Sequence, residues 1–393
     1  MLSFGLLWSR FLISLGMIFM LIAGLYGGSI TEKFQTFIKN KYYLGVTGIF
    51  FLFLLSGLWT DNHDYFIQRM TIKLPFFFLP FAVCSIRDLD KEDLIKALYV
   101  FVAFTLTGVL WSVGFFLTDI SYYIEIYSKG QILPTPVHHI RFSIMVSIAI
   151  AMCFYLFIQG EYLFRKQEKN IFLFLAFLMT IYLHLLAVRS GLMTLYVLLI
   201  VSFIYLIKNH ADKKTAFTIL LSGMAIVVCS IFFVPTVKNK IGYMKYSLEN
   251  YAEKKDIREL SDSRRLASIE AGIILGKENP ILGVGYGDLK DETNNYLIEH
   301  YPELKDLDLL PHNQYILALS TAGIIGMLLF ILFTTLPFFY HQAYSDFLFL
   351  STQLMFLVSF IVEHTIEAQI GTALYIFVLL LVMKNVEVRK LTT

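Results

Sequence analysis

The chain has 393 residues, of which 57% are hydrophobic and only 16% are charged. An ordinary soluble domain carries about 25% charged residues. This composition excludes a typical soluble protein and indicates a polytopic membrane protein.

Eleven apolar runs predict an all-α fold of about eleven transmembrane helices, within a range of ten to twelve. Most approach the roughly 20 residues that a helix needs to cross the hydrocarbon core, and helices satisfy their own backbone in lipid. The run at 74–86 is short and holds Pro75 and Pro80, so a re-entrant segment is the alternative there. The runs cover residues 11–28, 42–59, 74–86, 97–117, 142–158, 171–188, 190–207, 216–235, 314–337, 347–362 and 368–383.

The cysteines and the first apolar run fit the same interpretation. Cys84, Cys153 and Cys229 all fall within apolar runs, so we expect small buried residues and not a disulfide framework. The first run lacks a small-residue cleavage site after a short hydrophobic core, so we interpret it as a span and not as a removed signal peptide.

The distribution of basic residues predicts the orientation. One set of alternate short loops holds fifteen lysines and arginines and the other set holds six. Since retained positive charge marks the cytoplasmic side, we expect a cytoplasmic C-terminus and an outside N-terminus. The long polar insert at 236–312 then lies outside, between an N-terminal block of about eight helices (1–235) and a C-terminal block of about three with a short cytoplasmic tail (313–393).

Three outside arginines oppose this charge trend. Arg69, Arg141 and Arg189 lie at or near the ends of spans, where a charge drawn toward lipid loses solvation. Arg189 is the only charged residue between Ile171 and Ile207. Snorkelling to lipid phosphates explains any one of them. For Arg189 a functional role is favoured; for Arg69 and Arg141 the two interpretations are balanced.

The insert contains a predicted amphipathic helix and a glycine-rich turn. Residues 263–275 have apolar side chains at helical spacing behind a serine and two arginines. Asn279 and Pro280 end this pattern, and three glycines follow at 283–287. No strand precedes them and no Lys-Ser/Thr pair follows, so a nucleotide-binding loop is excluded. We expect a turn that folds the insert back onto the membrane.

His312 stands between Pro311 and Asn313, directly before the run at 314–337. A histidine at a helix start is often only an interface residue. With polar neighbours, however, an imidazole there can take or hold a proton near neutral pH. Gly323 and Gly326 predict close packing of the following helix on a neighbour.

Two further groups are candidates of lower weight. His138 and His139 precede Arg141, but adjacent residues usually point apart and no third ligand is near, so a loop lining a donor site is favoured over zinc. Glu363 and Glu367 flank His364 in the last outside turn, four residues apart on one helical face. A solvated turn is the plain interpretation; an acceptor-sugar contact or a second base is the alternative.

These motifs together resemble the signature region of the O-antigen ligase and O-antigen polymerase superfamily. The resemblance rests on residues 263–265, 279–285, 311–313 and 322–326. Arg189, Ser190 and Gly191 are similar to the Ser-Arg-Gly motif of the family, although Val188 stands where the family has serine. The resemblance is dense over about 260–330 and diffuse elsewhere, and the family usually has one span more than the eleven counted here.

The resemblance implies a metal-independent membrane glycosyltransferase without a cofactor. Its donor would be a glycan on undecaprenyl diphosphate, presented outside the bacterial inner membrane. A ligase passes the glycan to the lipid A core, whereas a polymerase passes a growing chain to the next lipid-linked repeat. His312, Arg265 and Arg189 match catalytic positions of the family.

Chemical reasoning extends this set to residues that would bind the substrates. Guanidinium groups grip phosphate oxygens in pairs, and a neutral imidazole suits removal of a hydroxyl proton. The candidate substrate-binding residues are Arg141, Arg69, Arg264, His139, Asn313, Glu363 and Glu367.

A transporter or flippase for the same lipid-linked sugar is the alternative of another class. Transporters tend to contain internal repeats with paired broken helices, and the two halves of this sequence show no convincing match. The single large outside insert favours an enzyme.

Overall fold

The computed structural model describes residues 1–86, 89–208, 213–305 and 307–392, and every regular element in this part of the chain is a helix. The α-helices are α1 (Leu2–Trp8), α2 (Arg10–Leu25), α3 (Ile30–Lys39), α4 (Lys41–Leu55), α5 (His63–Ser85), α6 (Lys91–Thr118), α7 (Ile120–Ile126), α8 (His139–Gln159), α9 (Glu168–Leu186), α10 (Arg189–Lys208), α11 (Lys213–Phe233), α12 (Pro235–Ala252), α13 (Ser261–Glu278), α14 (Leu289–His300), α15 (Gln314–Thr335), α16 (Phe347–Val362) and α17 (Gln369–Thr392). The 3-10 helices are η1 (Ser56–Leu58), η2 (Tyr127–Lys129), η3 (Pro302–Leu304), η4 (Leu336–Ser345) and η5 (Thr365–Glu367).

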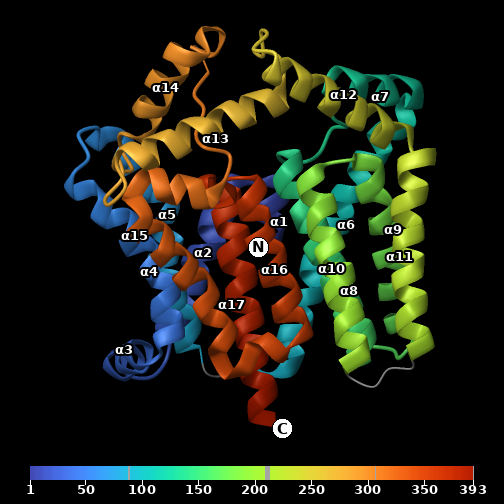
Figure 1. The fold of residues 1–393 in the computed structure, drawn as a ribbon. Helices are drawn as coiled ribbons and strands as arrows, with labels where there is room; N and C mark the ends of the chain where they lie inside the picture. Colours follow the sequence, from blue (N-terminus) through green and yellow to red (C-terminus); the bar gives the residue numbers. More distant parts are fainter. Residues whose placement is uncertain (87–88, 209–212, 306, 393) are drawn as a thin grey trace.

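The long apolar helices stand side by side in one bundle (Figure 1). Two of them form its interior: 83% of the apolar window of α8 and 78% of that of α17 are buried, against 33–50% for the other spans. The outer helices therefore turn much of their apolar surface outward, as expected where lipid is the solvent.

Each of the eleven predicted apolar runs is mostly helical, although the runs at 11–28, 171–188 and 216–235 extend past the ends of α2, α9 and α11. Among the described residues, eight helices are long and apolar enough to cross a membrane, or ten if each of two bent pairs counts as one span. α16, with 16 residues, is shorter. α5 is one continuous helix of 23 residues despite Pro75 and Pro80, so the re-entrant alternative is wrong.

The two bent pairs leave the bundle direction at opposite ends. α3 turns by 104° from α2, and α12 turns by 72° from α11. α3 lies across the end where α17 finishes, and α12 lies across the other end (Figure 1). α1, α3 and α7 are short helices that the apolar pattern does not predict.

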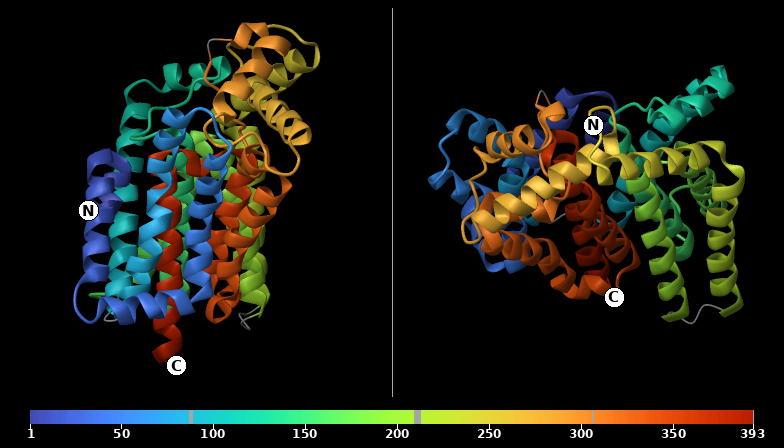
Figure 2. Two further views of the ribbon diagram at one scale, coloured as in Figure 1. Left: turned by 90° about the vertical axis from the view of Figure 1, so that its left-hand side faces the viewer. Right: turned by 45° about the horizontal axis from the view of Figure 1, so that its top comes forward.

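The insert forms a roof over one end of the bundle, made of α12, α13 and α14 (Figure 2). It has a small core of its own, in which Tyr243, Leu260 and Leu297 are among the buried members. The C-terminal end of α17 lies at the opposite end of the molecule (Figures 1 and 2).

Backbone hydrogen bonds join the roof to α15. α15 is broken at Ala322 and Gly323, where Gly323 has φ +66°. The glycine-rich turn enters this break: Val284 and Gly285 donate backbone N–H bonds of 2.8 and 3.0 Å to the carbonyls of residues 320 and 321, and the N–H of residue 324 bonds the Pro280 carbonyl at 2.8 Å. The predicted turn thus supplies partners that the broken helix lacks.

The cysteines are free. Cys153 is buried and Cys84 partly buried, but Cys229 is exposed. The prediction of burial is therefore wrong for Cys229, because α11 stands at the side of the bundle (Figure 1).

Candidate active site

A cavity of about 300 Å³ lies where the roof meets the bundle. It is formed by the starts of α8, α10 and α13, by α12, and by the segments before α8 and α15. Its charged and imidazole-bearing lining residues are His138, His139, Arg189, Lys240, Asp262, Arg264, Arg265 and His312. One acidic residue therefore stands among four basic residues and three histidines.

A tight helix hairpin holds Arg189 at this cavity. α9 ends at Leu186, Ala187 adopts a left-handed conformation with φ +49°, and α10 begins at Arg189. α10 then packs so closely on α8 that a Cβ at Gly191 would lie 2.4 Å from the Cβ of Ser143. Gly191 of the Arg-Ser-Gly motif thus allows the close contact between α10 and α8 that fixes the position of Arg189.

An ion pair joins this hairpin to the roof. The Arg189 guanidinium contacts Oδ1 of Asp262, which is in the first turn of α13. Asp262 Oδ2 is buried and has no hydrogen-bond partner among the described residues. Arg264 and Arg265 follow on the same helix, so α13 brings two more guanidinium groups to the cavity.

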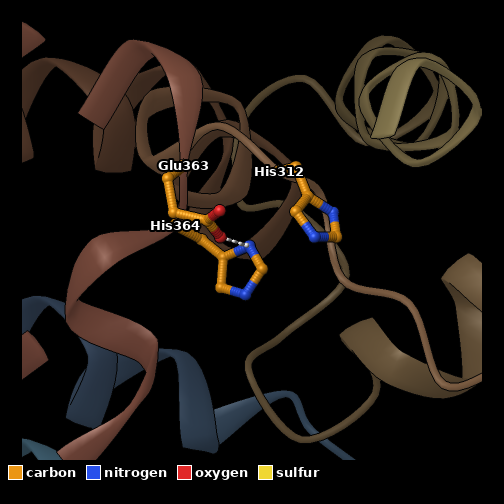
Figure 3. Close-up of side chains that lie close together, drawn as sticks. All are labelled: His312, Glu363 and His364. Carbon is orange, nitrogen blue, oxygen red and sulfur yellow. Dashed lines mark ion pairs between the residues drawn. The ribbon is translucent and has the colours of Figure 1, made fainter. Parts of the chain in front are cut away.

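A second charged cluster surrounds Glu363 at the end of α16 (Figure 3). Its carboxylate lies 3.3 Å from Nδ1 of His364, 3.5 Å from Nη2 of Arg265 and 3.9 Å from Nη2 of Arg141. The rings of His312 and His364 meet edge to face with centroids 4.6 Å apart. Arg265 therefore links the cavity to the turn after α16.

The surroundings keep His312 neutral and Glu363 ionised. Burial, reinforced by the positive charges nearby, lowers the pKa of His312 to about 3. Burial alone would raise the pKa of Glu363, but the neighbouring histidines and the guanidinium groups of Arg141 and Arg265 hold it at about 2. At neutral pH the site thus contains a hydrogen-bond-accepting imidazole beside a paired carboxylate.

A serine of α13 holds the His312 ring. Ser268 Oγ lies 3.0 Å from His312 Nδ1 and accepts a 3.3 Å bond from the backbone N–H of His312. The imidazole is thereby fixed relative to Arg265, which lies one helical turn before Ser268.

Among the residues that the structure describes, His312, Glu363 and His364 form a group that could hold a metal ion, because their donor atoms lie within 4.8 Å of one another. Two neutral imidazoles and a carboxylate form a donor set known from zinc sites. The guanidinium groups of Arg141 and Arg265, however, already compensate the carboxylate and would repel a divalent cation. The charges around the cluster therefore favour an anionic ligand.

Glu367 belongs to a separate buried cluster. Its carboxylate pairs with Arg69 and, at 2.6 Å, with Lys73 of α5. It also accepts hydrogen bonds from the Tyr286 hydroxyl and, at 2.8 Å, from Gln314 Nε2. A buried charge requires ion pairs and hydrogen bonds of this kind. Together they connect α5, the glycine-rich turn and α15 to η5.

Several predicted residues therefore lie elsewhere than the sequence indicated. Arg69 and Glu367 pair with each other and do not line the cavity. The interpretation of 363–367 as a solvated turn is wrong, because Glu363 and Glu367 are both buried. Asn313 caps α15 and donates a 2.8 Å bond to the backbone carbonyl of Ile361, so its amide is engaged by backbone.

His138 and His139 both line the cavity. Their rings stack with centroids 4.4 Å apart, so the expectation that adjacent residues point apart is wrong here. Arg141 lies one turn further along α8 and reaches His138 Nδ1 at 3.3 Å. The start of α8 thus contributes two imidazoles to the cavity, and Arg141 connects them with Glu363.

Fold and cavity together define a polytopic membrane protein that gathers guanidinium and imidazole groups at one end of its helix bundle. Residues 174–331 match the family model described as O-Antigen ligase, and this match supports membership of the O-antigen ligase superfamily. No curated protein sequence matches the chain. The family comprises glycosyltransferase-like ligases and polymerases, which supports an enzymatic role. Arg189, Arg265 and His312 fall within the matched segment.

Sequence reasoning missed Lys240, Asp262 and Ser268. Asp262 could have been noticed because it directly precedes Ser263, Arg264 and Arg265. Lys240 and Ser268 have no distinguishing local pattern, and only the contact between distant segments assigns them to the site.

Proposed function

We propose that the protein is a metal-independent glycosyltransferase of the bacterial inner membrane. It transfers a glycan from undecaprenyl diphosphate to an acceptor on the periplasmic face, the lipid A core being the acceptor that we favour. The family match supports ligase or polymerase chemistry in general. The donor, the acceptor and the membrane face are parts of the proposal.

The observation that carries the proposal is that Arg189, Arg265 and His312 line one cavity. They come from the α9–α10 hairpin, the roof and the segment before α15, far apart in sequence. A pyrophosphate and a sugar hydroxyl must be held together for transfer, so a shared cavity for cations and an imidazole is the necessary geometry.

The cations form the proposed clamp for the leaving group. Guanidinium forks bind phosphate oxygens in pairs and keep their charge at any working pH. Arg189, Arg264 and Arg265, together with Lys240 of the same cavity, can bind the donor's diphosphate and stabilise the charge that grows on it as the glycosyl bond breaks.

His312 is the proposed general base. The acceptor hydroxyl oxygen attacks C1 of the donor sugar, the bond from C1 to the phosphate oxygen breaks, and undecaprenyl diphosphate departs with the bonding electrons. The hydroxyl proton passes to His312. Glu363 is ionised and within 4.8 Å of the imidazole, so it can stabilise the imidazolium that forms.

The proposed sidedness follows from the basic loops. The loop set with fifteen lysines and arginines includes the C-terminal tail, and the tail lies opposite the roof (Figure 1). If the tail is cytoplasmic, as the positive-inside rule predicts, the cavity opens to the periplasm, where flipped lipid-linked glycans are presented.

The test is transfer by the purified protein in lipid nanodiscs. Undecaprenyl-diphosphate oligosaccharide is supplied with lipid A core, and the products are sized. One added block indicates a ligase, and a ladder in the absence of core indicates a repeat polymerase. No new glycosidic bond, together with donor movement across proteoliposomes, would replace the enzyme by a flippase.

The same assay tests the absence of a metal requirement. We expect the initial rate to be unchanged after treatment with a chelator, because guanidinium groups supply the positive charge. Loss of the rate with chelator and its return with added zinc or magnesium would contradict the proposed clamp.

A further inference from the structure

We propose that Ser268 is a positioning residue that places the single ring hydrogen of neutral His312 on Nδ1, leaving Nε2 as the proton acceptor. This inference rests on the proposed role of His312 as the base. It assigns a function to a serine on α13 that the family resemblance does not include.

The hydrogen-bond geometry around Ser268 is the basis. Its hydroxyl oxygen lies 2.8 Å from the backbone carbonyl of Arg265 and 3.0 Å from His312 Nδ1. It also receives the backbone N–H of His312 at 3.3 Å. Ser268 is completely buried, so water does not compete for these bonds.

The serine has one hydrogen to donate, which leaves two possible arrangements. If it donates to the Arg265 carbonyl, which can only accept, then Nδ1–H of His312 donates to the serine and all three contacts are hydrogen bonds. If it donates to Nδ1 instead, the contact with the Arg265 carbonyl is lost. The additional bond favours the first arrangement by roughly tenfold.

The other ring nitrogen is left available. Among the described residues, Nε2 of His312 has no hydrogen-bond partner, and it is not among the buried atoms that lack one. In the favoured arrangement this nitrogen carries a lone pair. A base with its hydrogen on Nε2 could only donate to an acceptor hydroxyl, so the choice of nitrogen decides whether the proton can be taken.

One helix therefore coordinates both halves of the site. Arg265 directs its guanidinium toward Glu363 and the cavity, while its carbonyl orients the hydroxyl of Ser268 three residues later. A shift of α13 would move the clamp and the base together.

The first test reads the ring hydrogen directly and needs no glycan. Histidine labelled with ¹⁵N is incorporated into the full-length protein in nanodiscs, and the His312 signals are assigned with His312→Gln. We expect the wild type to carry hydrogen on Nδ1 and Ser268→Ala to shift toward hydrogen on Nε2. A wild-type His312 with its hydrogen on Nε2 overturns the inference, whatever the activity.

The second test separates positioning from folding. Ser268→Ala should lower kcat about twofold or more, because without the tenfold preference at most about half of the His312 rings carry their hydrogen on Nδ1, and it should leave the KM for the lipid-linked donor unchanged. Ser320→Ala is the matched control, since among the described residues this buried hydroxyl bonds only backbone carbonyls of its own helix, and it should keep the wild-type kcat. Wild-type kcat in Ser268→Ala overturns the inference. Transfer by His312→Ala would instead refute the proposed base while the labelling result stands.

Discussion

Gly323 lies against Ile281 so closely that a Cβ on the glycine would be 2.1 Å from the isoleucine carbonyl oxygen. This contact holds the roof in the break of α15. We expect Gly323→Ala to lower stability by about 1–3 kcal/mol, through the clash and the left-handed φ. Thermal unfolding in detergent measures the change. Gly114→Ala is the control, because nothing lies within 4 Å of a Cβ added at that glycine. Equal melting temperatures for both variants would contradict the close contact between Gly323 and Ile281.

His312→Ala should reduce the transfer rate by about 10²–10⁴-fold, the usual contribution of a positioned base, with normal membrane insertion. The rate of glycan transfer and the level of the variant in membranes are measured together. His300→Ala is the control, since this exposed histidine is on α14 away from the cavity. Full activity of a well-expressed His312→Ala variant would remove the imidazole from the mechanism.

Arg189→Lys and Arg265→Lys should each lose transfer about tenfold or more, because an ammonium group cannot reproduce the paired grip of a guanidinium. Steady-state kinetics with the lipid-linked donor provide the measurement. Arg165→Lys, an exposed residue in a loop outside the cavity, serves as the control. Wild-type kcat/KM in both cavity variants would mean that only the net charge matters.

Glu367→Gln should destabilise the protein by about 3–5 kcal/mol, because it leaves Arg69 and Lys73 buried without their shared carboxylate. A thermal unfolding scan shows the loss as a lower midpoint. Glu32→Gln, on the exposed side of α3, should leave the midpoint unchanged. A stable but inactive Glu367→Gln variant would indicate a direct catalytic part for this carboxylate.

The pH profile of kcat/KM should be flat from about pH 8 down to about pH 5. An imidazole is a base only when neutral, and burial lowers the pKa of His312 to about 3, so protonation begins below this range. An ordinary histidine would instead lose activity as the pH falls through about 6.5. A decline centred near that value in the wild type would show that His312 is hydrated and normally basic.

Local patterns in the sequence predicted the helices well. Each of the eleven apolar runs is mostly helical, because a membrane-spanning backbone has to satisfy its own hydrogen bonds. Helices α1, α3 and α7 escaped prediction, since they are short and carry no long apolar run. The break in α15 escaped too, because the only local signal was Gly323 within an otherwise apolar sequence.

The site was predictable in part. Arg189 stood out as a charge that opposes its surroundings, and Arg265 and His312 stood out through their motifs; all three line one cavity. Arg69 also opposed its surroundings, but it pairs with Glu367, and a single sequence does not tell a charge paired at long range from one kept for a ligand. Lys240 and Ser268 gave no comparable signal.

The backbone hydrogen bonds between the glycine-rich turn and α15 have a consequence for biosynthesis. The ribosome makes residues 279–285 before α15, so the turn has to wait outside the membrane until its partner helix is released from the translocon. Until they meet, the carbonyls of Ser320 and Thr321 lack the donors Val284 and Gly285. Maturation of this span therefore ends with a docking step, and truncation of the chain before α15 would leave the turn without its partner helix.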